Sequence, residues 1–325
     1  MIINSNRTRE VQEYYFSRKL KEVSKLIGNG EPIINMGIGS PDIFPSRSVI
    51  KALEKSLSDP NAHKYQSYIG LTELRKSISK FYMKFFSVKL NPKNEVLPLI
   101  GSKEGIMHIS LAFLNPGDKV LIPNPGYPTY LSVTKLVEAD PLFYNLNEKN
   151  EWFPNISDLE KLDLSKVKLM WINYPHMPSG STITKPKLEK LISFTKKHKI
   201  ILINDNPYSF ILNNELVSLM SNKESFDNCL ELNSLSKSFN LAGWRVGMLI
   251  GSEKFISSVM KIKSNIDSGM FYGIQKGAIE ALNLDKSWFE SINKIYSERR
   301  KLVWKLAELM NCSFSKKSAG MFVWA

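Results

Sequence analysis

Short apolar runs that alternate with amphipathic stretches are the feature of this 325-residue chain that most constrains its fold. Such runs are typical of strands buried on both faces of a sheet, and the stretches between them carry apolar residues at helical spacing. Parallel strands need crossover connections of this kind. The sequence therefore predicts an α/β fold with a mostly parallel sheet. The predicted strands cover residues 96–100, 119–123, 167–173, 199–205 and 246–251.

Two of the intervening helices are well marked. In the first, Thr184 suits an N-cap and Pro186 suits the first turn. A second helix begins near Leu71. Their apolar residues recur at helical spacing, which predicts that they pack in the core rather than bind a ligand. These residues are Leu188, Leu191, Ile192 and Thr195 in the first helix, and Leu74, Ile78, Phe81, Tyr82 and Phe85 in the second.

The two ends of the chain differ from its middle. The beginning predicts a helix over residues 14–27, a stop at the Gly-Asn-Gly of 28–30, and then a loop. The end predicts a basic helix that leads into the strand-like GMFVWA. We therefore expect residues 45–285 to form a large domain, and residues 1–44 and 286–325 to belong to a smaller α+β domain.

Composition and charge exclude several classes of function. The formal charge is +13, but the lysines are scattered and no zinc-finger spacing or RNP-type motif accompanies them, so nucleic-acid binding is not expected. The apolar runs are far shorter than the roughly 20 residues of a membrane helix. The N-terminus lacks the pattern of a secretory signal, and Cys229 and Cys312 have no metal-ligand spacing. These features favour the cytoplasm, with no membrane partner and no metal.

Chemically useful residues follow the predicted strands, where ligands of open α/β sheets bind. The turn GSKEGIMH (101–108) runs into a helix whose first N–H groups could hold a phosphate, although a plain strand-to-helix turn explains it as well. Asp205 ends another strand, where a carboxylate more often forms a turn than acts in catalysis. The segment 233–247 carries Ser234, Ser236, Lys237 and Arg245.

Lys237 is the most informative of these residues. A lone lysine is normally a solvated charge, but this one lies among hydroxyl and apolar residues and precedes an arginine suited to anion binding. Partial desolvation and nearby positive charge lower the pKa of an amine and allow it to form a Schiff base. With an anion pocket and the Asp205 carboxylate, these groups are the parts that hold pyridoxal phosphate.

Eight segments, some of which carry these residues, resemble in this order the class I/II aminotransferases of fold type I over essentially the whole chain. The greatest similarity is to the group that contains LL-diaminopimelate, alanine and related aminotransferases. The segments are GIGSPD (37–42), YQSYIGLTELR (65–75), GSKEGI (101–106), NPGYPTY (124–130), YPHMPSG (174–180), NDNPYSF (204–210), SLSKSFNLAGWRVG (234–247) and SNIDSGMFYGIQ (264–275).

The resemblance implies a seven-stranded sheet sandwiched by helices, pyridoxal phosphate as the cofactor, and roles for particular residues. Lys237 would form the imine with the cofactor and later move the proton between the substrate Cα and the cofactor C4′. Asp205 would pair with the pyridine nitrogen, Tyr208 would bond the phenolic oxygen, and Tyr127 would stack on the ring. The phosphate would be held by Ser102, Lys103, Ser234, Ser236 and Arg245.

Two further positions matched by the resemblance concern the substrate and a partner. Gly39 lies in the loop that would close over the substrate carboxylate. Tyr65 matches the tyrosine that reaches the phosphate of the neighbouring subunit, which implies a homodimer with shared sites.

The chain departs from the family pattern at two places. Met177 stands where the family has an asparagine that donates to the cofactor's phenolic oxygen, and a thioether cannot donate a hydrogen bond. The chain also ends at GMFVWA, where the family continues into the rest of the small domain with an arginine that grips the substrate carboxylate. From this we expect a fragment or an interrupted reading frame.

The activity implied is transfer of an amino group from an amino acid to a 2-oxo acid such as 2-oxoglutarate, by a ping-pong mechanism through Lys237, in amino-acid biosynthesis. A C–S β-lyase of the same fold is an alternative with the same cofactor. A second alternative is a non-catalytic homologue, which Met177 and the missing arginine favour and which Lys237, Asp205, Tyr208 and Arg245 oppose.

Overall fold

The computed structural model describes residues 3–35 and 39–325. Two residues of the predicted substrate loop, at 37 and 38, lie outside this range, whereas Gly39 lies within it. None of the helices in the described part of the chain combines the length and apolar character that a bilayer crossing needs.

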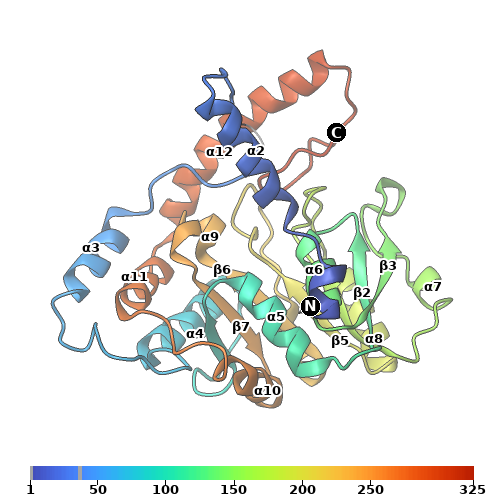
Figure 1. The fold of residues 1–325 in the computed structure, drawn as a ribbon, viewed down its shortest axis with the longest axis horizontal. Helices are drawn as coiled ribbons and strands as arrows, with labels where there is room; N and C mark the ends of the chain where they lie inside the picture. Colours follow the sequence, from blue (N-terminus) through green and yellow to red (C-terminus); the bar gives the residue numbers. More distant parts are fainter. Residues whose placement is uncertain (1–2, 36–38) are drawn as a thin grey trace.

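One seven-stranded sheet forms the centre of the molecule (Figure 1), with the strand order β1-β7-β6-β5-β4-β2-β3. Strand β7 runs antiparallel to both of its neighbours, and the other pairs are parallel, so the predicted mostly parallel α/β sheet is confirmed. The strands are β1 (Val96–Leu99), β2 (Lys119–Asn124), β3 (Asp140–Asn145), β4 (Val167–Ile172), β5 (Ile201–Asp205), β6 (Cys229–Ser234) and β7 (Gly247–Gly251).

Helices cover both faces of the sheet, as Figure 1 shows. They are α1 (Asn6–Glu10), α2 (Tyr15–Gly28), α3 (Arg47–Ser56), α4 (Thr72–Phe86), α5 (Ser102–Phe113), α6 (Pro128–Leu136), α7 (Ile156–Leu159), α8 (Lys185–Lys197), α9 (Leu235–Ser238), α10 (Glu253–Lys263), α11 (Tyr272–Leu282) and α12 (Lys286–Leu309). Short 3-10 turns lie at Glu148–Asn150, Leu219–Ser221, Lys223–Asp227 and Ala242–Trp244.

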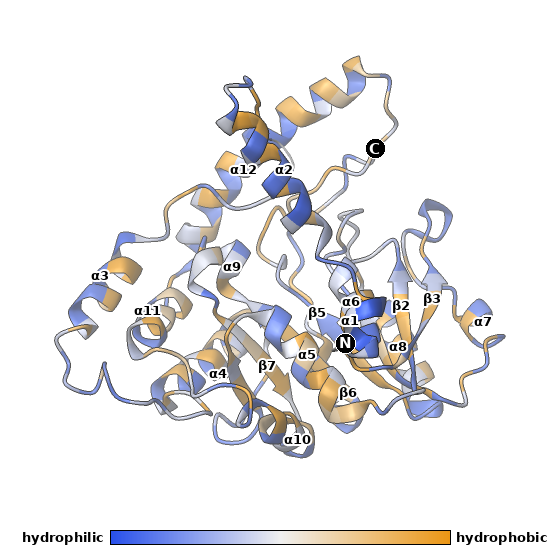
Figure 2. Ribbon diagram, in the orientation of Figure 1, coloured by the Kyte–Doolittle hydropathy of each residue, from blue (hydrophilic) through white to orange (hydrophobic). Residues whose placement is uncertain are grey.

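The sheet separates two hydrophobic cores. Alternate residues of a strand point to opposite faces, so Val96 of β1 lies in one core while Leu97 and Leu99 lie in the other. The first core is covered by α4, α8 and α11, and the second by α5, α6 and α10. Figure 2 shows the hydrophobic colour on the central strands and a polar α1.

The two helices marked by the sequence are present, and their predicted apolar faces are buried. Helix α8 has Thr184 at its N-cap position and Pro186 in its first turn, although the Thr184 side chain makes no capping hydrogen bond. Its residues Leu188, Leu191, Ile192 and Thr195 are buried. In α4, Leu74, Ile78, Phe81 and Tyr82 are buried, and Phe85 packs against the same core.

The ends of the chain follow the prediction in their helices but not in the last segment. Helix α2 stops at the Gly-Asn-Gly, where Gly30 takes a φ of +87°. The end GMFVWA forms no strand. The backbone N–H groups of Ala319 and Gly320 donate instead to Gly180 O, at 2.7 Å, and Ile211 O, at 2.8 Å. The predicted strand was wrong because an apolar run becomes a strand only where a neighbouring strand pairs with it.

Helices α2 and α12 project beyond the sheet at the same end of the molecule (Figure 1). Arg299 of α12 makes an ion pair with Asp42, with N–O distances of 2.7 and 3.0 Å. The first turns of α12 reach the large core, because Phe289 stacks on Phe210 at a centroid distance of 4.4 Å. The division at residues 44 and 285 stays a prediction.

Candidate active site

The carboxyl ends of the central strands bring the predicted chemical groups to one edge of the sheet. Asp205 is the last residue of β5, and β6 passes directly into the short helix α9 that carries Lys237. The turn between these two elements is fixed by Ser234, whose hydroxyl accepts a hydrogen bond from Ser236 N at 3.0 Å. This is the N-cap arrangement that starts a helix at the end of a strand.

Asp205 is a buried carboxyl group, with 4% of its surface exposed. The Tyr130 hydroxyl donates to Oδ2 at 2.9 Å, whereas Oδ1 has no hydrogen-bond partner among the residues that the structure describes. Burial raises the pKa of Asp205 to about 6, against the opposing effect of the Tyr130 hydrogen bond. A buried acceptor without a partner is costly, so this oxygen is suited to a donor that the chain itself does not supply.

The frame around Asp205 was not anticipated from the sequence. Tyr130 stacks on Trp171 with ring centroids 5.0 Å apart and an interplanar angle of 8°. The Asn173 side chain donates to Asp205 O at 2.5 Å and accepts from Met177 N at 2.8 Å. Asn173 therefore ties the turn at 174–180 to the end of β5. The only sequence signal for this role is its position after β4, which it shares with ordinary turn residues.

Lys237 is partly buried, and its ammonium group donates to Gly39 O at 3.3 Å. Its pKa is lowered by burial and, to a smaller extent, by the positive charge of Arg245. Both causes are those expected from the sequence. They make the amine a better nucleophile near neutral pH.

Backbone and guanidinium pack closely together at the position before α5 where the sequence predicts an anion site. Gly101 has a φ of +86° and a ψ of 155°, and a Cβ there would lie 2.4 Å from Arg245 Nη2. A Cβ on Gly247 would lie 2.6 Å from Ser102 N. Lys103 follows in the first turn, and its pKa is lowered by burial and by Arg245. Because Gly101 and Gly247 lack side chains, the Arg245 guanidinium and the backbone at the start of α5 can pack closely together.

Aromatic residues form one wall of the site. Burial raises the pKa of Tyr127 well above its usual range, and the nearby Tyr14 raises it further. Tyr14 also lies under the Lys103 ammonium group, which is 4.0 Å from the ring centroid. The sequence analysis missed Tyr14, because nothing in the N-terminal pattern distinguishes it from its aromatic neighbours Tyr15 and Phe16.

Tyr208 faces Met177. Its hydroxyl donates to the Met177 sulfur at 3.8 Å, and burial raises the pKa of Tyr208 well above its usual range. Phe322 packs edge-on against the Tyr208 ring at 5.7 Å. The segment that was predicted to be a strand therefore forms part of the wall of the site.

Tyr65 is the one predicted residue that lies apart from these groups. Its surface is 92% exposed, and it lines a shallow surface hollow with Ser268, Gly269 and Phe271.

These residues fit pyridoxal phosphate. The Asp205 Oδ1, which has no partner among the described residues, can accept the proton of a pyridine nitrogen, and the Lys237 amine has a lowered pKa. Gly101 lets the cationic Arg245 guanidinium pack against the start of α5, where an anion is favoured. A mostly parallel sheet that carries these three features at its carboxyl edge defines the class of pyridoxal-phosphate-dependent enzymes of fold type I.

Comparison with known proteins agrees with this class. Residues 31–325 match the family model of aminotransferase class I and II. The chain is 35% identical to the LL-diaminopimelate aminotransferase of Aquifex aeolicus over 322 residues, which are 98% of this chain and 83% of that protein. It is 38% identical to the enzyme of the same name from Natranaerobius thermophilus over 324 residues, covering 99% and 84%.

Solved structures show the same likeness. The apo structure of BacF from Bacillus subtilis superposes with a TM-score of 0.95 at 34% identity, covering 100% of this chain and 84% of that one. An aminotransferase from Staphylococcus aureus gives a TM-score of 0.89 at 29% identity, covering 99% and 83%. The chain belongs to the class I and II aminotransferases and is a pyridoxal-phosphate-dependent transaminase.

Proposed function

We propose that this transaminase takes the amino group of LL-diaminopimelate, or of a closely related amino acid, and passes it to 2-oxoglutarate. The donor is suggested by the curated relatives that carry the name LL-diaminopimelate aminotransferase. The observation that carries the catalytic part of the proposal is the buried Asp205, with one carboxylate oxygen bonded by Tyr130 and the other without a partner.

The cofactor supplies an electron sink for the carbon that loses its proton. Asp205 would maintain that property by keeping a proton on the pyridine nitrogen. The negative charge of the buried carboxylate favours the positively charged, protonated form of the ring. Tyr130 and Asn173 hold the carboxylate and its backbone in place, with donor distances of 2.9 and 2.5 Å.

Lys237 would hold the cofactor and, once released, would move the proton of the substrate Cα. Its lowered pKa supports this role, because a general base is most effective when its pKa lies near the operating pH. Tyr208 would donate to the phenolic oxygen, and Tyr127 would lie against the ring.

The start of α5 would hold the cofactor phosphate. The backbone N–H groups of Ser102 and Lys103 and the Arg245 guanidinium would be its donors, together with the hydroxyl groups of Ser234 and Ser236. Charge supports this assignment, because a helix N-terminus and an arginine both favour a phosphate dianion. Gly39 would lie against the substrate carboxylate.

We also propose that the chain works as a cytoplasmic homodimer. Tyr65 is almost fully exposed, and in a dimer it would reach the phosphate of the neighbouring site.

The first experiment is the visible absorption spectrum of the chain with added pyridoxal phosphate, before and after borohydride, beside Lys237→Ala. We expect a band that borohydride removes in the unmutated chain and that Lys237→Ala lacks. The second is a transamination assay with LL-diaminopimelate and 2-oxoglutarate. Absence of the band in the folded chain would contradict the site. Release of pyruvate and ammonia from a sulfur amino acid without an oxo acid would identify a β-lyase instead.

A further inference from the structure

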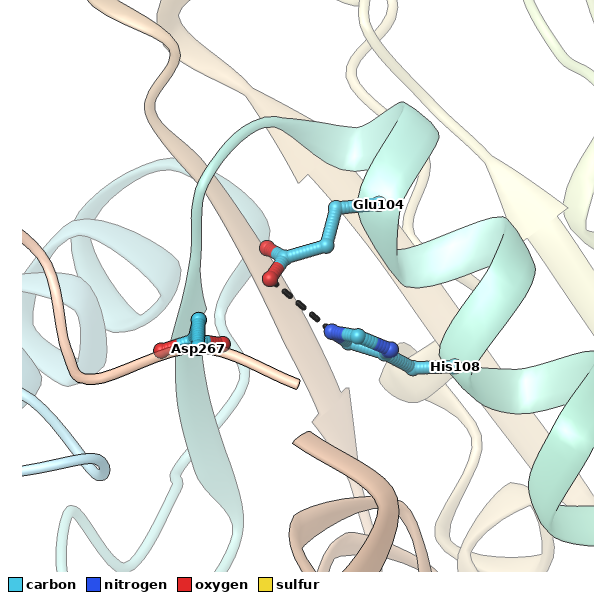
Figure 3. Close-up of side chains that lie close together, drawn as sticks. All are labelled: Glu104, His108 and Asp267. Atoms are coloured by element: carbon cyan, nitrogen blue, oxygen red, sulfur yellow. Dashed lines mark hydrogen bonds and ion pairs between the residues drawn. The ribbon is translucent and has the colours of Figure 1, made fainter. Parts of the chain in front are cut away.

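An ionic cluster, partly to fully buried, lies between α5 and the end of α10, beside the proposed phosphate site. Glu104, His108 and Asp267 carry ligating atoms that all lie within 4.8 Å of one another, and Figure 3 shows Glu104 bonded to His108 with Asp267 beside them. Such a set could hold a metal ion. The chain supplies a cation of its own, however, because the Lys263 ammonium group lies 2.5 Å from Asp267 Oδ2 and 3.9 Å from Glu104 Oε1. Lys263 is only 2% exposed.

Glu104 connects this cluster to the phosphate site. Its Oε2 accepts a hydrogen bond from Ile100 N at 2.5 Å, and its Oε1 pairs with His108 Nε2 at 2.8 Å. Ile100 directly precedes Gly101, whose missing Cβ leaves the place taken by Arg245. The Glu104 side chain therefore fixes the turn that leads into the N–H groups of Ser102 and Lys103.

The position of Glu104 carries an electrostatic cost. An acidic residue in the first turn stabilises the helix, but it also repels a phosphate dianion that binds to the same turn. Asp267 adds a second carboxylate to the cluster. The positive charge of Lys263 compensates this negative charge, and because Lys263 is buried, water screens the attraction only weakly.

The other end of the cluster reaches the segment that carries Tyr65. Asp267 Oδ1 accepts from Gly269 N at 2.8 Å. Gly269 has a φ of +88°, and a Cβ there would lie 2.7 Å from Gln66 O. The cluster thus holds the loop 264–271 close to the backbone next to Tyr65, so the same set of charges borders the turn before α5 and, through Gly269, the segment that carries Tyr65.

We infer that Lys263 is a positioning residue for the cofactor phosphate, acting through Glu104 and Asp267 rather than by contact. It keeps Glu104 on the Ile100 N–H group and offsets the two carboxylates, so that the start of α5 accepts an anion. The inference rests on the proposed phosphate site.

The test compares two ligands. Affinities for pyridoxal phosphate and for pyridoxal, which lacks the phosphate, are measured by absorbance titration of the full cofactor-free chain. The quantity of interest is the preference for the phosphorylated ligand. We expect Lys263→Met to lower this preference at least about tenfold, or about 1.4 kcal/mol. Lys263→Arg, which keeps the charge, should recover part of it, and Lys261→Met, an exposed lysine of the same helix, should leave it within about twofold.

Circular dichroism establishes that each variant is folded. If Lys263→Met does not fold, Lys263→Gln removes the same charge, retains a donor toward Asp267, and must lower the preference likewise. An unchanged preference in a folded variant, or an equal loss of affinity for both ligands, would overturn the inference. An unmutated chain that binds both ligands equally would instead contradict the proposed phosphate site, and with it this inference.

Discussion

At the scale of single residues, Asp205 combines a favourable position for chemistry with a cost in stability. Burial raises its pKa to about 6 from an ordinary value of 3.8. The folded state therefore binds a proton more tightly than the unfolded state between these pH values, and stability falls as the pH rises through that range. Above pH 6 the loss of stability levels off at about 3 kcal/mol, because each unit of pKa shift contributes about 1.4 kcal/mol.

Asp205→Asn should remove this pH dependence from the cofactor-free protein while retaining an acceptor for Tyr130. We expect the free energy of unfolding of the unmutated chain to decrease between pH 4 and pH 6.5 relative to that of the variant, by up to about 3 kcal/mol. Urea unfolding at several pH values measures the difference. Parallel curves for the two proteins would show that Asp205 is not the responsible group.

In the proposed site, Met177 would determine how many donors reach the phenolic oxygen of the cofactor. The Tyr208 hydroxyl now faces a sulfur at 3.8 Å, which accepts but cannot donate. Met177→Asn would add a donor that stabilises the phenolate, so the pH-dependent change of the visible spectrum should move to lower pH. A hydrogen bond of about 1 kcal/mol corresponds to a shift of about 0.7 pH unit.

A spectrophotometric pH titration of the loaded protein tests this expectation. Met177→Leu has no donor and similar bulk, so its transition should coincide with that of the unmutated chain. A Met177→Asn transition at the same pH or higher would contradict the proposed contact between residue 177 and the phenolic oxygen.

Residues of the site differed in how far the sequence could predict them. Asp205 was found because it ends a predicted strand, and Lys237 was found because hydroxyl groups and an arginine surround it in the sequence. Tyr130, Asn173 and Tyr14 were missed, because their roles depend on residues far away in the sequence. Tyr130 lies 75 positions and Asn173 32 positions from Asp205, and Tyr14 lies 113 positions from Tyr127. Periodicity within an element carries no information on such contacts.

At the scale of elements, the turn between β1 and α5 shows why glycine is required before the phosphate site. Gly101 has a backbone conformation that is almost exclusive to glycine, and its missing side chain makes room for Arg245. Gly117 has a similar φ of +82°, but no atom lies within 4 Å of a Cβ placed there. A substitution at Gly117 therefore introduces backbone strain alone, whereas one at Gly101 also brings a collision with the guanidinium group.

We expect Gly101→Ala and Gly117→Ala each to lower stability by about 1–2 kcal/mol, because alanine is strained at positive φ. Only Gly101→Ala should also weaken binding of pyridoxal phosphate, by about tenfold or more, because it displaces a charged hydrogen-bonding group. Thermal unfolding and cofactor titration measure the two effects. Equal affinities in the two variants would show that Arg245 does not contribute to cofactor binding.

The strands show which elements a sequence pattern can predict. The five predicted strands are buried and apolar, whereas β3 and β6 were missed. Strand β3 is an edge strand that begins Asp-Pro and is largely exposed. Strand β6 is central but contains Glu231, whose buried carboxylate accepts from Tyr82, Ser218 and Leu219 at 2.7 to 3.0 Å. Its polar residues are tolerated only because other elements supply these donors.

At the scale of the whole molecule, the proposed site is divided between one subunit and its partner. Lys237 lies on α9 at the strand ends, while Tyr65 lies exposed beside the loop that Gly269 anchors. If Tyr65 serves the neighbouring site, then Lys237 and Tyr65 of one active site come from different chains. A symmetric dimer of this kind allows complementation between defective subunits.

Mixing Lys237→Ala with Tyr65→Ala chains should therefore restore activity. In a hybrid dimer, one site has both defects and the other has neither. With equal amounts and free exchange, half of the dimers are hybrids, so about one quarter of the sites should be intact. The mixture is unfolded and refolded together, and its transamination rate is compared with that of each variant treated alone. A mixture no more active than the mean of its two components would contradict the shared site, because each defect would then stay within its own chain.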